Sequence, residues 1–437
     1  MNPIHPDRTR MPQPAGFEKL NIKEPEKIIL ENGLPVYLIP GDDQEVTRLD
    51  LVFDAGTSFQ DMKLQAAAVN DLLAEGTRGH SSLEIAELLD FHGAYTDYFL
   101  TKDMAGITLY GLTKYYDRLL PVISELVSEA VFPEDELSLF LDRRKQEFQV
   151  NSQKVNYKAS QAFNRLIFGE KSAYGQTLEE NDFDKLKRED LLRFYRKHYQ
   201  EKGFLAILSG KIDKLLIKKT NEILGTLPQK KDEPAVTKTK EFVLPCREEK
   251  EFIKKEDALQ SALRIGRLGI SRHHPDFPGL SLLNTVLGGY FGSRLMRSVR
   301  EEKGYTYGIY SAIQNYRHAD MFSIATEVNA QYTSHALNEI KHQMRLLCEE
   351  KIGSEELQTV KNYVYGSYLR NFDGPLQLAE RFKKSTELGI RFSSYKELLD
   401  KMMQLTPDDL FPLAEKYLCP DRMKTLVVGD VSALTGD

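Results

Sequence analysis

The stretch LLNTVLGGYFGSRLMRSVREEKGYTYGIYS, residues 282–311, combines an apolar helix, a glycine-rich turn, a second helix and a tyrosine-rich strand. The second helix is expected to bury Leu295, Met296 and Val299 and to end near Gly304. The glycines do not indicate a phosphate site, because no Lys-Ser/Thr pair follows them and the dinucleotide fingerprint is not matched. This stretch decides the fold prediction because it resembles an earlier part of the chain.

The sequence reads as two related halves. LLNTVL around Asn284 resembles AVNDLL around Asn70, and the later segments HGAYTDYFLT and KGYTYGIYSA also resemble each other. Each half closes with an aliphatic strand that ends at a glycine, Gly210 in FLAILSGKID and Gly429 in KTLVVGDVS. Internal duplication at this length predicts two copies of one fold.

The secondary-structure pattern favours the α+β class. Strand-like segments are grouped rather than strictly alternating with helices, which argues against a doubly wound parallel sheet. Helix signals are clear in places: Ser81 and Glu84 form a capping-box pattern, and Gly93 stands where a helix should end. We therefore expect two homologous domains in tandem, each a mainly antiparallel sheet packed with helices.

The expected domain boundaries follow from a charged segment, LPQKKDEPAVTKTKE, which contains two prolines and lacks apolar periodicity. They give an extended N-terminal segment at 1–22, a first domain at 23–230, a linker at 231–242 and a second domain at 243–437.

Composition narrows the functional classes. The 437 residues are 41% hydrophobic and carry a net charge of −6, which argues against nucleic-acid binding. No stretch approaches the roughly 18 apolar residues of a membrane span, and the N-terminus lacks a secretory apolar region. Three cysteines show no metal-ligand spacing and cannot all pair. We expect a cytoplasmic protein without a membrane span.

LVFDAGTSFQ and QAAAVNDLLAEGT resemble the opening of the insulinase/pitrilysin-like metallopeptidases, the inverzincins, in which H-x-x-E-H precedes a Gly-Thr pair. Alignment on Gly76 and Thr77 places the three motif positions at Ala67, Asn70 and Asp71. A methyl group cannot bind zinc, and a neutral amide cannot take a proton from water. One carboxylate is a poor substitute for two imidazoles. The sequence predicts that this half holds no zinc.

The resemblance also implies a distal glutamate ligand, and Glu147 in DRRKQEFQV falls near the expected distance. Two interpretations stay open. Asp71 and Glu147 could bind another cation, or the helix kept its packing and lost its metal; we favour the second.

The stretch at 282–311 resembles the second-domain motif of the same family, in which S-R-L leads into R-E-x-x-G-x-x-Y. Arg300 and Tyr307 occupy the Arg and Tyr of that pattern. The resemblance implies that the pair reaches the zinc from the metal-free domain. A tyrosine hydroxyl, protonated up to about pH 10, would stabilise the oxyanion, and the arginine would hold a substrate carbonyl.

Simpler interpretations of this motif are a solvated Arg300 in the last helical turn and a Tyr307 that shares a strand face with Tyr305 and Ile309. Arg294 is interpreted as structural.

The arginine and tyrosine of the second-domain motif are present, whereas the zinc-binding residues of the first half are absent. The resemblance therefore implies a catalytically incomplete subunit of a heterodimeric zinc metallopeptidase, inactive alone and without a bound cofactor. A homologous partner would carry H-x-x-E-H and the zinc, and the substrate would be a peptide. Self-association into a homodimer in the partner's absence stays open. The alternatives are a non-catalytic scaffold or assembly protein of the same family, and a protease with an unusual metal site.

Overall fold

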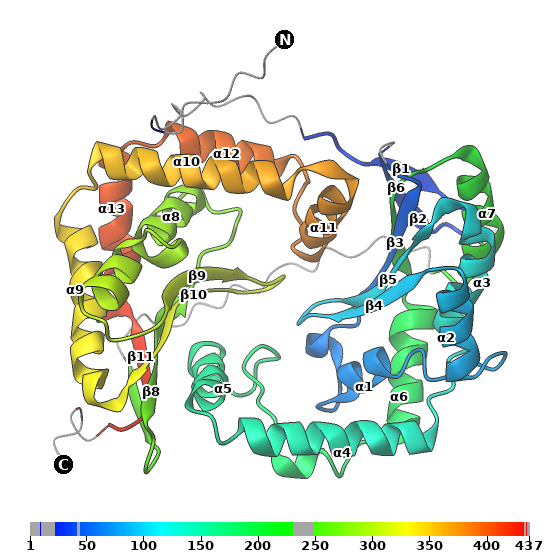
Figure 1. Cartoon of the computed structure of the whole chain (residues 1–437), viewed down its shortest axis with the longest axis horizontal. Coiled ribbons are helices and arrows are strands. Elements are labelled where there is room, and N and C mark those ends of the chain that lie inside the picture. The colour runs from blue at the N-terminus through cyan, green and yellow to red at the C-terminus, as the bar shows by residue number, and fades with distance from the viewer. Residues whose placement is uncertain (1–8, 10–21, 42–43, 230–248, 432–433, 435–437) are drawn as a thin grey trace.

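The computed structural model describes residues 9, 22–41, 44–229, 249–431 and 434, which form two β-sheets surrounded by helices (Figure 1). The expected linker at 231–242 and all but residues 9 and 22 of the N-terminal segment lie outside the described residues, so the proposed boundaries stay a prediction. Among the described residues, no helix has the length and apolarity needed to cross a membrane.

The first sheet contains six strands, in the order β1-β2-β6-β3-β5-β4. Only the β2–β6 pair is parallel. The strands are β1 (Glu26–Ile29), β2 (Pro35–Pro40), β3 (Val46–Phe53), β4 (Tyr95–Leu100), β5 (Ala105–Leu112) and β6 (Phe204–Gly210).

The second sheet contains five strands, in the order β7-β11-β8-β10-β9. Only the β11–β7 pair is parallel. The strands are β7 (Lys250–Lys254), β8 (Gln260–Leu268), β9 (Ile309–Asn315), β10 (Asp320–Asn329) and β11 (Lys424–Gly429).

The two sheets repeat one topology. Without β1, the order of the first sheet matches that of the second strand for strand, and the parallel pair occupies the same place in both. Gly210 and Gly429 end equivalent strands, with φ angles of +97° and +143°. These are backbone conformations that favour glycine. The predicted α+β fold with two homologous, mainly antiparallel sheets is confirmed.

Within the described residues, seven α-helices belong to the first half of the sequence: α1 (Gln65–Asp71), α2 (Ser82–Phe91), α3 (Tyr116–Ser128), α4 (Glu134–Asn151), α5 (Val155–Phe168), α6 (Arg188–Tyr195) and α7 (Lys214–Leu224). Six belong to the second half: α8 (Phe277–Asn284), α9 (Thr333–Glu349), α10 (Ser354–Asn371), α11 (Gly374–Glu387), α12 (Ser394–Gln404) and α13 (Pro407–Leu418). Segments wound as π-helix cover Arg196–Glu201, η5 (Thr285–Gly289) and η6 (Met296–Glu302).

In each sheet, one face is covered by a helix from the other half of the sequence. Helix α5 packs on β8 and β11, and α11 packs on β2 and β6. Figure 1 shows α4 and α5 connecting the halves along one side, and α10 to α12 along the opposite side. The central strands β3 and β11 are buried on both faces, which requires cover on both sides of each sheet.

A buried ionic network also joins the halves. Asp50 on β3, fully buried, accepts hydrogen bonds from Arg48 (2.7 Å), Thr108 (2.7 Å) and Lys383 on α11 (3.0 Å). Glu380, also on α11, accepts from Arg48 at 2.6 Å. Because these charges are paired, the halves are linked by charge-assisted hydrogen bonds as well as by apolar packing.

Candidate functional site

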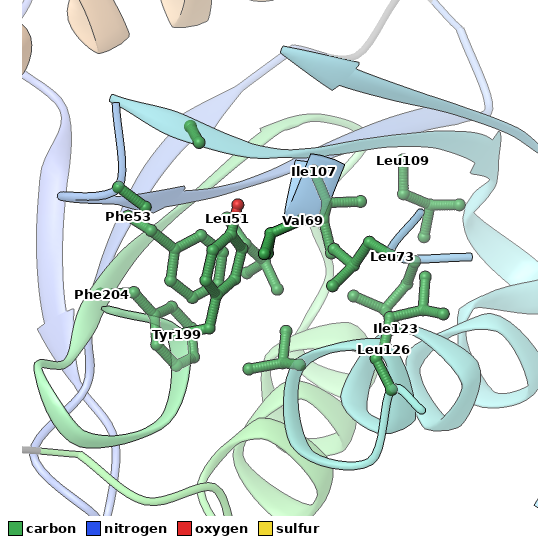
Figure 2. Packing of buried hydrophobic residues seen from close by; sticks show 14 of the residues in the cluster. Leu51, Phe53, Val69, Leu73, Ile107, Leu109, Ile123, Leu126, Tyr199 and Phe204 are labelled. Atoms are coloured by element: carbon green, nitrogen blue, oxygen red, sulfur yellow. The ribbon is translucent and has the colours of Figure 1, made fainter. Parts of the chain in front are cut away.

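Helix α1 keeps its packing in the core. Val69 lies among Leu51, Leu73 and Ile107 in the first hydrophobic cluster (Figure 2). The fully buried Gln65 accepts hydrogen bonds from the backbone of residues 61 and 62 and donates to the carbonyl of residue 190 at 2.8 Å. The helix ends at Asp71, and a turn precedes Gly76.

The three motif positions lie in different environments on this helix. Ala67 is half-buried against the core, and Asp71 is partly exposed at the helix end. Asn70 is 1% exposed, and neither its amide oxygen nor its amide nitrogen has a hydrogen-bond partner among the residues that the structure describes. Such a buried, unpaired polar group costs about 1–3 kcal/mol of stability.

Asp71 and Glu147 are brought together by a residue that the sequence analysis missed. The Arg144 guanidinium lies 2.7 Å from the Asp71 carboxylate and 3.2 Å from that of Glu147. Burial lowers the pKa of Arg144, but the two carboxylates outweigh burial and raise its pKa overall. Within the described ranges, no group of three or more His, Cys, Asp or Glu side chains could hold a metal.

The second motif spans η6 and the loop that precedes β9. Leu295, Met296 and Val299 are buried as predicted, and Gly304 follows the helix with a φ of +64°. Arg294 forms a bidentate ion pair with Glu356 on α10, with N–O distances of 2.8 and 2.7 Å, which fits a structural role.

The loop before β9 is anchored on both sides of Tyr307. The Tyr305 ring stacks on Tyr332 at 4.9 Å. The Thr306 hydroxyl donates a hydrogen bond to the Glu327 carbonyl at 2.7 Å and accepts one from the Gly308 N–H at 3.1 Å. Tyr307 itself is 95% exposed and precedes the strand, so it does not belong to a strand face. The loop therefore presents its side chain to solvent from a fixed backbone.

Arg300 is half-buried on η6, and its Cζ lies 4.8 Å from the centroid of the Phe291 ring. The hydrogen bonds and ion pairs recorded for the described residues do not join this motif to α1. The two candidate sites are thus separate constellations within one chain.

Comparison with known proteins shows a family resemblance. Residues 185–364 match the family model described as the peptidase M16 inactive domain. This segment contains Arg300 and Tyr307, so the second candidate site lies within the part of the chain that resembles this family. The chain is 26% identical to the "non-peptidase homolog YmxG" of Helicobacter pylori, over 74% of this chain and 75% of the relative. It is 21% identical to the beta subunit of the mitochondrial-processing peptidase of Rattus norvegicus, over 86% of this chain and 78% of that subunit.

The fold of this chain has a solved counterpart. It superposes on the crystal structure of a peptidase M16 inactive domain from Pseudomonas fluorescens with a TM-score of 0.82 and 22% identity, covering 93% of this chain and 98% of the other. At this identity the likeness establishes the fold. The predicted resemblance to the insulinase/pitrilysin-like peptidases is confirmed.

Proposed function

We propose that this chain is the metal-free subunit of a heterodimeric zinc metallopeptidase that hydrolyses peptides. It would supply Arg300 and Tyr307 to a zinc held by a homologous chain with an intact H-x-x-E-H motif. The observation that carries the proposal is the contrast between the two motifs. Tyr307 is fully presented to solvent by an anchored loop, whereas Arg144 occupies the space between the two carboxylates left at the degenerate site.

The chemistry required of this chain is transition-state stabilisation. The partner's zinc would activate the attacking water. As the scissile carbonyl becomes tetrahedral, negative charge develops on its oxygen, and the Tyr307 hydroxyl would donate a hydrogen bond to it. The Arg300 guanidinium, always charged, would hold a neighbouring peptide carbonyl through its N–H donors.

The relatives support both the proposal and its main alternative. One relative is the beta subunit of a processing peptidase, which favours a subunit role. Another is named a non-peptidase homolog, which favours a non-catalytic scaffold or assembly protein. A scaffold has no need of both the arginine and the exposed tyrosine of this motif, and for this reason we favour the catalytic role.

A reconstitution experiment tests the proposal. The purified chain is mixed with an H-x-x-E-H homologue from the same genome, and cleavage of an internally quenched fluorescent peptide is followed. We expect turnover from the mixture and from neither chain alone, together with a 1:1 complex in size-exclusion chromatography. A complex that forms without turnover would instead support the scaffold alternative. Full turnover by the partner alone would contradict the proposal.

A further inference from the structure

The glycine-rich turn places an aromatic ring against the proposed catalytic arginine. Phe291, at the centre of this turn, is 64% exposed, and its ring centroid lies 4.8 Å from the Arg300 Cζ. A guanidinium is attracted to the face of an aromatic ring at this distance. We infer that Phe291 is a positioning residue, which holds the Arg300 guanidinium in the orientation needed to bind a peptide carbonyl. The inference rests on the proposed function.

One end of the turn is pressed against the edge strand β9. A Cβ atom at Gly288 would lie 2.6 Å from the backbone nitrogen of Ser311, so only glycine allows this approach. The Ser311 hydroxyl donates to the carbonyl of Asn284 at 3.0 Å, which ties the preceding helix to the same strand. The backbone that leads into Phe291 is therefore held in place.

The other end of the turn is fixed to α10. The Tyr290 ring packs on Tyr363 at 4.9 Å, and a Cβ atom at Gly292 would lie 2.8 Å from the Tyr290 ring. Beyond the turn, Arg294 is clamped by Glu356 on α10. Because the backbone is secured before and after Phe291, its outward-facing ring forms a fixed platform for Arg300.

The contacts of Arg300 differ from those of the arginines that form ion pairs with carboxylates. Arg144 contacts two carboxylates and Arg294 one, whereas no carboxylate contact of Arg300 is recorded among the described residues. An aromatic ring orients the guanidinium plane without neutralising its charge or occupying its in-plane N–H donors. The long arginine side chain then loses less rotamer freedom when substrate binds.

The test uses the reconstituted mixture of this chain with its zinc-bearing homologue and a quenched fluorescent peptide. Phe291→Leu should raise KM about two- to five-fold, the strength of an exposed cation–π contact, and leave kcat nearly unchanged. Phe291→Tyr should restore the original KM, because it keeps the ring face. The matched control is Phe91→Leu on α2, which removes another highly exposed phenylalanine (85%) and should leave KM unchanged.

A double-mutant cycle with Arg300→Ala separates this inference from the proposed function. We expect Phe291→Leu to have no further effect on KM once Arg300 is alanine. If Arg300→Ala lowers activity but Phe291→Leu is silent or acts additively, the positioning role is wrong and the proposed function stands. If Arg300→Ala is silent, or the mixture shows no turnover, the proposed function fails and the positioning role fails with it.

Discussion

The guanidinium of Arg144 lies 2.7 Å from the Asp71 carboxylate and also contacts Glu147, at 3.2 Å. The side chain of Arg144 thus bridges the two carboxylates that the sequence comparison assigned to degenerate zinc-motif positions. These carboxylates act as an ion-pair site for a side chain of the same domain.

Removing the Arg144 guanidinium should cost little stability. All three side chains are partly exposed, and an ion pair in such a place contributes at most about 1 kcal/mol. We expect Arg144→Met to lower the free energy of unfolding by up to about that amount in urea denaturation. Arg143→Met, at the exposed neighbouring position, is the matched control and should have no effect. A loss several times larger would show that the arginine supports the helix in another way.

Asn70 and Gln65 should respond in opposite directions to replacement by leucine. The Asn70 amide is buried without a partner, so Asn70→Leu should stabilise the protein by about 1–3 kcal/mol. Gln65 is buried with its hydrogen bonds satisfied, so Gln65→Leu should be destabilising. Thermal denaturation of both variants measures the contrast. Destabilisation by Asn70→Leu would indicate that the amide has a partner in solution.

His198 should make stability fall in acid. Burial, helped by Lys202 and Lys197, lowers the pKa of His198 to about 4, against the hydrogen bond with the Asp54 carbonyl. Between this value and the ordinary pKa near 6.5, the unfolded state binds more protons than the folded state. The contribution of His198 to the free energy of unfolding is therefore complete above pH 6.5 and declines as pH falls towards 4.

At pH 5, protonation linked to His198 lowers the free energy of unfolding by about 2 kcal/mol relative to neutral pH. His198→Gln should flatten the pH dependence of the unfolding free energy by about that amount relative to the parent chain. Urea titrations at pH 5 and pH 7 give this difference directly. An unchanged slope in the variant would assign the acid sensitivity to other groups.

The link between the halves depends on Asp50. Asp50→Ala would leave Arg48 and Lys383 buried without this carboxylate, which costs about 3–5 kcal/mol. We expect a correspondingly lower midpoint in chemical denaturation. Lys396→Ala removes an exposed ion pair with Asp400 and should be nearly neutral by comparison. Equal effects of the two substitutions would argue against a network that joins the halves.

The sequence predicted local features better than long-range ones. The capping box at Ser81 and Glu84 and the glycines that end β6 and β11 are present in the structure, because a short segment determines each of them. The sharing of α5 and α11 between sheets was not predicted, since an apolar helix face does not reveal which sheet it will cover. Spacing on α4 could have suggested the pair of Arg144 with Glu147, but the approach of Asp71 depends on tertiary packing.

The most direct measurement is the kcat of the reconstituted mixture after Tyr307→Phe. Loss of one hydrogen-bond donor to the oxyanion should lower kcat about 10²- to 10³-fold, with the complex still formed. Tyr310→Phe is the matched control, because Tyr310 is also an exposed tyrosine (56%) and lies at the start of β9; it should leave kcat unchanged. An unchanged kcat in Tyr307→Phe would contradict the proposed catalytic role of this chain.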